Sequence, residues 1–117
     1  MKTQIKNIIL GVALITLSGC YYDRVLPIEV EGEISYSQQV QTVFDSKCIG
    51  CHNGSQAPDL QSGLSYDNLM NGGYITVEAP ASSLLYTKLN GGSMDGFASS
   101  NDKSTILKWI EQGANNN

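Results

Sequence analysis

Apolar residues recur at helical intervals in several short stretches of the chain. In the first, residues 38–47, Val40, Val43 and Phe44 fall at positions i, i+3 and i+4 and so share one side of a helix. Ser37, a residue type that commonly caps helix N-termini, directly precedes this stretch. We therefore predict a helix over residues 38–47 that buries these three side chains.

Two further helices are expected in the middle of the chain. One begins at Ser65 and ends at the Asn-Gly-Gly run of residues 71–73. The other covers residues 82–89, starts close to Pro80 and is expected to turn three leucines inward: Leu84, Leu85 and Leu89. Residues 74–77 are β-like in composition, but four residues without a partner strand are weak evidence for a sheet.

The last predicted helix has clear ends. Ser100 or Asn101 can cap it, Asp102 suits its positive N-terminal end, and Gly113 stops it. Its apolar face is broad enough to be packed: Ile106, Leu107, Trp109 and Ile110. Residues 114–117 are expected to fray. The pattern as a whole predicts an all-α fold.

The longest apolar stretch lies at the start of the chain. Lys2 and Lys6 precede about ten apolar residues, the length of a signal-peptide core rather than of a membrane span. The stretch ends in Leu-Ser-Gly-Cys at residues 17–20, which resembles the lipobox of bacterial lipoproteins. We expect residues 1–19 to be a lipoprotein signal peptide and Cys20 to be lipidated. A plain secretory peptide and an uncleaved short anchor are alternatives.

Residues 20–35 mix a proline with acidic residues and show no sustained periodicity. We interpret them as an extended, lipid-anchored tether that precedes a domain of residues 36–117. An apolar patch at residues 25–28 could instead dock on the domain as a covering strand. The lipid at Cys20 would hold the chain at the bacterial cell envelope, on a periplasmic or outer-surface face of a membrane.

The chain is acidic, with a net charge of −4. Removal of residues 1–19 takes away Lys2 and Lys6 and leaves a net charge of about −6. Such a balance argues against nucleic acid as a partner, because affinity there comes from basic side chains that neutralise phosphates. It is compatible with redox donor and acceptor proteins that have basic surfaces.

The most specific signal is the run Cys48-Ile49-Gly50-Cys51-His52. Two thiols at this spacing can add to the two vinyl groups of one haem, and the adjacent histidine can bind the iron. We therefore predict that Cys48 and Cys51 hold a covalent haem c and that His52 is its proximal ligand. Phe44 lies four residues before Cys48 and is expected where the core meets the cofactor.

Three alternatives exist for the two neighbouring cysteines. A thioredoxin-like redox disulfide usually sits in a βαβ unit, whereas this motif follows a helix and leads into a loop. A structural zinc site needs four ligands, but His52 is the only histidine and Cys20 is needed at the N-terminus. The third alternative is a lipoprotein without haem, stabilised by a disulfide.

The expected sixth iron ligand is a methionine thioether, because no second histidine exists. Met94 lies in the glycine-rich run 91–96, which could bring a side chain over the iron, whereas Met70 ends a short helical pattern and is expected in the core. We assign Met94; an open or His-only site is the alternative.

Large apolar residues are few in a domain of about 80 residues, where a side-chain core alone gives only a few kcal/mol of net stability. Phe44, Phe97 and Trp109 are the largest candidates, and a covalent haem would supply the missing apolar volume. Protein without haem is therefore expected to be largely unfolded.

Together these motifs resemble the small single-haem c-type cytochromes, class I-like with His and Met ligands, of the kind carried on bacterial lipoproteins. The resemblance covers nearly all of residues 36–114. Five segments carry it: residues 48–53, residues 64–69, residues 83–86, Met94, and Trp-Ile-Glu-Gln-Gly-Ala at residues 109–114. In one respect the chain differs, because Asp95 stands where the family usually has proline.

The resemblance implies a cytochrome c-like fold of three to four short helices around one covalent haem. The N- and C-terminal helices would cross and set Phe44 against Trp109 or Ile110. It also implies that a backbone carbonyl near Pro58 accepts the Nδ1 proton of His52 and so raises its basicity as a ligand.

The function expected from these features is electron transfer by one c-type haem, without substrate transformation. The sequence contains no second histidine, no phosphate-binding loop, and no nucleophilic residue paired with a general base at a readable spacing. The alternative is a haem-based ligand sensor or weak peroxidase in which Met94 can be displaced.

Overall fold

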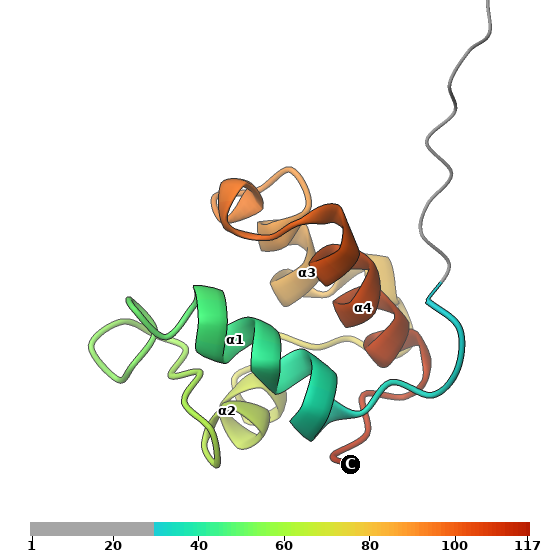
Figure 1. Cartoon of the computed structure of the whole chain (residues 1–117), viewed down its shortest axis with the longest axis horizontal. Helices are drawn as coiled ribbons and strands as arrows, with labels where there is room; N and C mark the ends of the chain where they lie inside the picture. Colours follow the sequence, from blue (N-terminus) through green and yellow to red (C-terminus); the bar gives the residue numbers. More distant parts are fainter. Residues whose placement is uncertain (1–29) are drawn as a thin grey trace, which may run out of the picture.

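The computed structural model describes residues 30–117. The predicted signal peptide, Cys20 and most of the predicted tether lie outside these residues. The chain forms a π-helical turn η2 (Tyr36–Val40) that continues into α1 (Gln41–Lys47), then α2 (Ser65–Asn71), η3 (Pro80–Ser82), α3 (Leu84–Leu89), η4 (Asp95–Phe97) and α4 (Ser100–Glu111). Figure 1 shows α1, α2, α3 and α4 packed into one body.

The predicted all-α class is confirmed for the part of the chain that the structure describes, which contains helices and no strands. Residues 74–77 have an irregular backbone. None of the helices within residues 30–117 is long and apolar enough to cross a lipid bilayer.

The first helix buries the predicted stripe, since Val40, Val43 and Phe44 are all buried. Its predicted start at Ser37 is wrong by two residues. Ser35 has an extended backbone and its Oγ accepts a hydrogen bond from the Gln38 amide (3.3 Å), which makes it the N-cap. The Ser37 amide instead donates to the backbone oxygen of Asn117 (2.9 Å), far away in the sequence.

The start of α4 was also misplaced. Its N-cap is Ser99, not Ser100 or Asn101, because Ser99 stands three residues before Asp102 and forms a capping box with it. The Ser99 Oγ accepts from the Asp102 amide (3.2 Å), and the Asp102 carboxylate accepts from the Ser99 amide (2.8 Å). The predicted stop is confirmed, since Gly113 takes the left-handed backbone (φ +104°) that favours glycine.

The two middle helices follow the predicted pattern with two exceptions, because α3 begins at Leu84 rather than at Ser82 and one of its three leucines is exposed. The helix at Ser65 ends as expected at the Asn-Gly-Gly run. In α3, Leu85 and Leu89 are buried, but Leu84 is 43% exposed, so its predicted burial was wrong. Leu84 instead lines the cavity described below.

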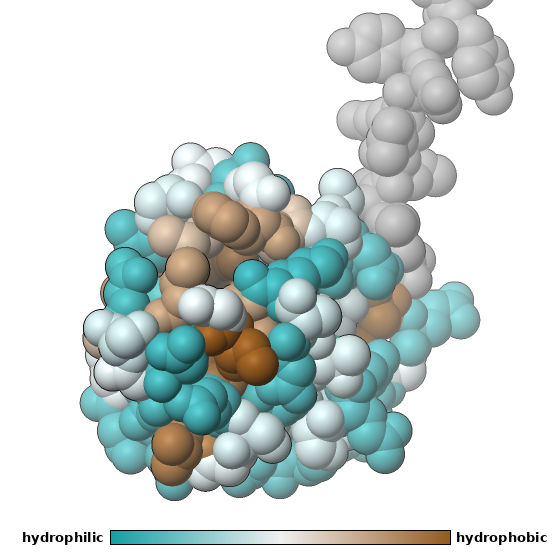
Figure 2. Space-filling model, turned by 60° about the vertical axis from the view of Figure 1, so that its left-hand side comes forward, coloured by the Kyte–Doolittle hydropathy of each residue, from teal (hydrophilic) through white to brown (hydrophobic). Residues whose placement is uncertain are grey.

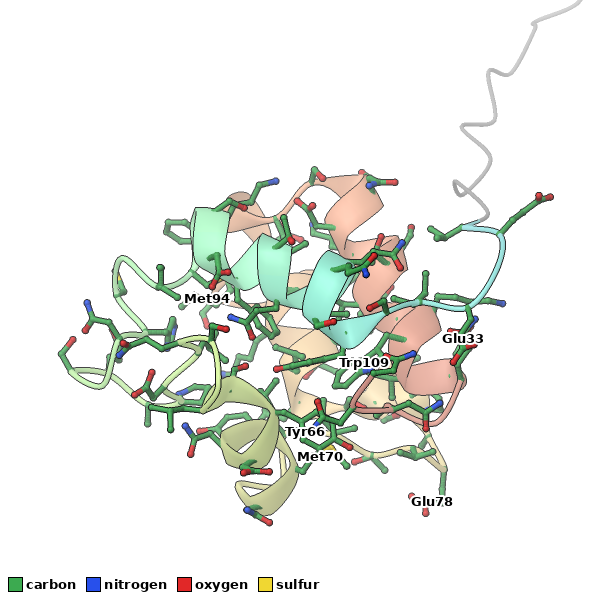
Figure 3. All side chains as sticks on the ribbon, turned by 60° about the horizontal axis from the view of Figure 1, so that its bottom comes forward. Glu33, Tyr66, Met70, Glu78, Met94 and Trp109 are labelled. Atoms are coloured by element: carbon green, nitrogen blue, oxygen red, sulfur yellow. The ribbon has the colours of Figure 1, made fainter. Side chains whose placement is uncertain are left out.

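The first and last helices meet through an aromatic cluster. The ring of Tyr36, in η2, lies 5.0 Å from Trp109 and 5.2 Å from Tyr66 between centroids. Figure 3 shows that Tyr66 and Trp109 both lie away from Met94. Tyr36 is also the aromatic partner of Phe44 (6.4 Å), and Phe44, Trp109 and Ile110 all belong to the same buried core.

The hydroxyl of Tyr36 belongs to a buried polar chain. Ser65 donates its single proton to the Gln41 side-chain oxygen, so the Tyr36 hydroxyl must donate to the Ser65 Oγ (2.6 Å). Burial raises the pKa of Tyr36 to about 12, and the hydrogen bond with Ser65 partly opposes that rise. The tyrosine is therefore held in its neutral form across the physiological range.

The C-terminal residues are held in place, and the prediction that residues 114–117 fray was wrong. Ala114 is fully buried, and its carbonyl accepts from the Tyr66 hydroxyl (2.9 Å). The buried indole N–H of Trp109 needs an acceptor and finds the carbonyl of Asn115 (2.9 Å). The tail therefore completes the polar bonding of the aromatic cluster.

Part of the segment that the sequence assigned to the tether packs on the domain. Ile34 is buried, and its amide donates to the side-chain oxygen of Gln112 (2.8 Å), whose amide nitrogen donates to the Gly32 carbonyl (2.7 Å). Asn117 donates to the carboxylate of Glu33 (3.1 Å). Residues 32–35 are thus joined to the C-terminal end of the domain.

Asn117→Ala is expected to destabilise the protein by about 1 kcal/mol. The Oδ1 of Asn117 accepts from the Tyr36 amide (2.8 Å) at the start of the first helix, and the substitution leaves this donor unpaired. The midpoint of thermal unfolding should shift down by about 4–8 °C. Asn116→Ala is the matched control, because Asn116 is exposed like Asn117 but its side chain makes no hydrogen bond within residues 30–117; an equal shift in both variants would contradict the prediction.

Candidate functional site

A cavity of about 440 Å³ opens at the end of the molecule where α1 finishes. The loop after α1, helix α3 and the segment around η4 form its other walls. Figure 2 shows apolar residues gathered around a hollow on this face. The cavity is mainly apolar, and its largest apolar lining residues are Phe44, Leu60, Leu84, Leu85, Leu89 and Phe97. Within residues 30–117, no aspartate or glutamate lines it.

Cys48, Cys51 and His52 all line this cavity because the chain turns tightly after α1. The Cys48 amide still bonds to the Phe44 carbonyl (2.9 Å), and the His52 amide bonds back to the Cys48 carbonyl (2.9 Å). Cys48 is half-buried, Cys51 is exposed, and both are free thiols. Burial is the main cause that raises the pKa of Cys48; the nearby Asp102 adds to the rise and Lys47 opposes it.

The ring of His52 is fixed by a single backbone acceptor. Its Nδ1 lies 3.0 Å from the carbonyl oxygen of Pro58, as the resemblance implied. A carbonyl can only accept, so the Nδ1 carries the proton of the neutral ring and the Nε2 keeps its lone pair. The side chain lines the cavity with this lone pair available to a metal ion.

Met94 lies on the same cavity and Met70 does not. Met94 is partly buried against the core, and its amide donates to the Lys88 carbonyl at the end of α3 (2.9 Å). Met70 is partly buried at the end of α2, and Figure 3 shows the two methionines well apart. The structure therefore brings together Cys48, Cys51, His52 and Met94, and leaves Met70 in the core region.

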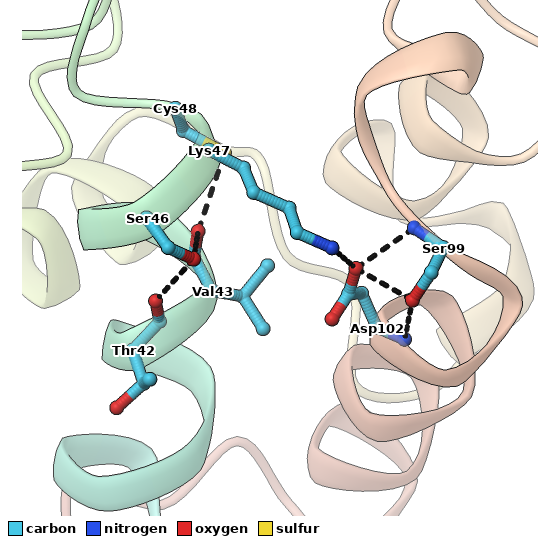
Figure 4. A network of polar contacts seen from close by, with 7 residues as sticks. All are labelled: Thr42, Val43, Ser46, Lys47, Cys48, Ser99 and Asp102. Atoms are coloured by element: carbon cyan, nitrogen blue, oxygen red, sulfur yellow. Dashed lines mark hydrogen bonds and ion pairs between the residues drawn. The ribbon is translucent and has the colours of Figure 1, made fainter.

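An ion pair connects the end of α1 to the start of α4 beside the cysteines. Lys47 donates to the Asp102 carboxylate, which also accepts from the amide (2.8 Å) and hydroxyl (2.7 Å) of Ser99 (Figure 4). Burial alone would raise the pKa of Asp102, but the hydrogen bonds from Lys47 and Ser99 outweigh it and hold the pKa below its usual value. This network fixes the spacing of the two helices next to Cys48.

Several residues of the cavity were missed or misplaced from the sequence. Phe97 was counted as a core candidate but is 62% exposed at the cavity, and Leu84 stands beside it as a lining residue. Lys47 and Lys88 also line the cavity. One signal could have found Lys88, because it follows Leu84 by four residues and so shares its side of α3.

Among residues 30–117, no three His, Cys, Asp or Glu side chains are grouped so that they could hold a metal ion. A haem iron needs fewer protein ligands than such a cluster provides, because the porphyrin nitrogens supply the rest. This finding therefore does not bear on the assignment of His52 and Met94.

The lining of the cavity is the basis for assigning a function. No protein-family model, no curated protein and no solved structure matches this chain. Function therefore has to be inferred from the chemistry of the residues around the cavity.

Proposed function

We propose that the protein is an electron carrier with one covalently attached haem c. One observation carries the proposal: Cys48, Cys51, His52 and Met94 line a single apolar cavity, although Met94 is distant from the other three in the sequence. Thioether links would form at the two cysteines, and His52 and Met94 would be the axial ligands. The fold is then of the cytochrome c type.

The cavity suits a large, flat, apolar group. Its volume of about 440 Å³ lies within the usual range for cofactor sites, roughly 300–1,000 Å³. Phe97 and Leu84 line the cavity and are 62% and 43% exposed, and a porphyrin would cover both. A covalent haem would thus account both for the exposure of these two side chains and for the spacing of the two cysteines.

When bound, the haem would supply a reversible one-electron change at its iron. The protein's own residues would set how readily that change occurs. The Pro58 carbonyl holds the Nδ1 proton of His52 and makes its Nε2 a stronger donor. The apolar walls keep water away, and a methionine thioether opposite histidine favours a comparatively high reduction potential.

The N-terminal residues complete the proposal. Removal of residues 1–19 and lipidation of Cys20 would anchor the carrier to a membrane of the bacterial cell envelope. Its partners would be redox donor and acceptor proteins rather than a substrate. The predicted signal peptide and Cys20 lie outside the described residues, so this part depends on the sequence alone.

The visible spectrum of protein exported from a host with a haem-maturation system tests the proposal. A red protein with a thioether-type α-band is expected for the wild type, whereas Cys48→Ala, Cys51→Ala protein should be colourless. Colourless wild-type protein would favour the disulfide-bonded lipoprotein. Rapid carbon monoxide binding by the reduced protein at neutral pH would favour the sensor or peroxidase.

A further inference from the structure

The loop that carries Met94 is attached to α3 by its backbone. The Met94 amide donates to the Lys88 carbonyl (2.9 Å). Gly92 packs so closely on α3 that a Cβ there would lie 2.4 Å from the Thr87 carbonyl oxygen. These contacts position the start of the loop. After Met94 the backbone is held by two longer hydrogen bonds, from the Asp95 amide to the Gly92 carbonyl (3.2 Å) and from the Phe97 amide to the Met94 carbonyl (3.1 Å).

The side chain of Asp95 also restrains the segment after Met94. Its Oδ1 accepts from the Gly91 amide (2.8 Å), which closes a short turn across Met94. The same oxygen accepts from the Lys103 ammonium group (2.5 Å) on α4. The carboxylate thus joins both ends of the loop to each other and to the last helix.

The two charged side chains of this ion pair differ in exposure. The Lys103 side chain is only 17% exposed, so its ammonium group has little freedom to swing away, whereas Asp95 is 50% exposed. These hydrogen bonds hold the pKa of Asp95 below its usual value, with the bond from Lys103 as the largest cause. At neutral pH the carboxylate is therefore charged, as the pair with Lys103 requires.

We propose that Asp95 is a positioning residue that holds Met94 toward the cavity through Gly91 and Lys103. The inference rests on the proposed function, because it concerns the stability of the bond between Met94 and the haem iron. A glycine-rich loop without this restraint would spend more time with the thioether away from the iron. An added ligand would then compete more successfully for the vacated position.

Imidazole binding to the oxidised holoprotein measures this competition. Asp95→Ala removes both contacts of the carboxylate and is expected to raise the imidazole affinity several-fold, up to about tenfold. Asp95→Asn retains an oxygen for the Gly91 amide, and Lys103→Met removes only the ammonium group. Both variants should raise the imidazole affinity less than Asp95→Ala does. If Asp95→Ala does not accumulate as holoprotein, these two variants test the role of Asp95 in its place.

Matched controls come from the same helix. Lys108 and Glu111 form an exposed pair on α4 (4.0 Å), and neither residue lines the cavity. Lys108→Met and Glu111→Ala should leave imidazole affinity unchanged. Hydrogen exchange supplies a readout independent of the iron, because the Gly91 amide should exchange faster in Asp95→Ala and stay protected in Lys103→Met.

Two results would overturn the inference in different ways. The proposed role of Asp95 alone would be overturned if the wild type shows the thioether-to-iron band but Asp95→Ala has unchanged imidazole affinity. An equal increase in affinity in the Lys108 and Glu111 controls would overturn the same role. Wild-type holoprotein that lacks the thioether-to-iron band would overturn the assignment of Met94 as a ligand, and this inference with it.

Discussion

Met94→Leu is expected to abolish the thioether-to-iron absorption band and to lower the reduction potential of the holoprotein by on the order of 100 mV. Leucine fills a similar volume but has no sulfur to donate to the iron. Because a thioether stabilises reduced iron more than oxidised iron, its removal destabilises the reduced state more. Absorption spectroscopy and a potentiometric titration measure the two effects. The covalent attachment at Cys48 and Cys51 should be unaffected, since neither thioether involves Met94.

Met70→Leu is the matched control for this substitution. Met70 packs against the core and does not line the cavity, so the band and the potential should both be retained. The swap conserves volume and should cost less than about 1.5 kcal/mol of stability. Loss of the band in Met70→Leu, with its retention in Met94→Leu, would reverse the ligand assignment.

The double variant Cys48→Ala, Cys51→Ala is expected to be largely unfolded. Without haem, the domain would have to maintain a mainly apolar cavity of about 440 Å³. Leu→Ala substitutions that open much smaller cavities already cost about 3–5 kcal/mol. That is comparable to the whole net stability of a domain of this size, roughly 3–5 kcal/mol. Far-ultraviolet circular dichroism should show weak helical signal and no cooperative thermal transition.

Met94→Leu holoprotein serves as the control for that experiment. It keeps both cysteines and so should keep the covalent haem, a strong helical signal and a cooperative transition. A similar cooperative transition in the double cysteine variant would show that the aromatic cluster around Trp109 holds the fold by itself. The haem would then be dispensable for folding.

Local sequence information was sufficient to predict the helices, but of their first residues it placed only that of α2 correctly. The burial of Val40, Val43 and Phe44 follows from their spacing alone. The start of the first helix depends on Asn117, whose backbone oxygen takes the Ser37 amide and leaves Ser35 as the cap. Such a contact between the two ends of the domain has no signature in a local pattern.

The candidate site shows the same division. Cys48, Cys51 and His52 are adjacent in the sequence, so one motif identified all three. Met94 could be proposed only by excluding other ligands, and the exposed position of Phe97 at the cavity has no signature in its local sequence. The contacts of Asp95 were equally hidden, because its partner Lys103 lies on another helix.

Net charge is a further property that the sequence describes only on average. The described part of the chain has no acidic residue in the cavity lining, although the chain as a whole is acidic. Lys47 and Lys88 both line the cavity, and Lys47 is also paired with Asp102. The acidic net charge therefore predicts long-range attraction to a basic partner better than it predicts the charges such a partner would meet at the cavity.

The attachment of residues 32–35 to Gln112 and Asn117 determines the route of mechanical load through the domain. A pull exerted through the N-terminal segment would pass from Ile34 and Glu33 into the end of α4 and the C-terminal residues. Figure 3 shows Glu33 at the opposite side of the molecule from Met94. Tension on the segment would thus be borne far from the cavity, and the loop that carries Met94 would keep its geometry.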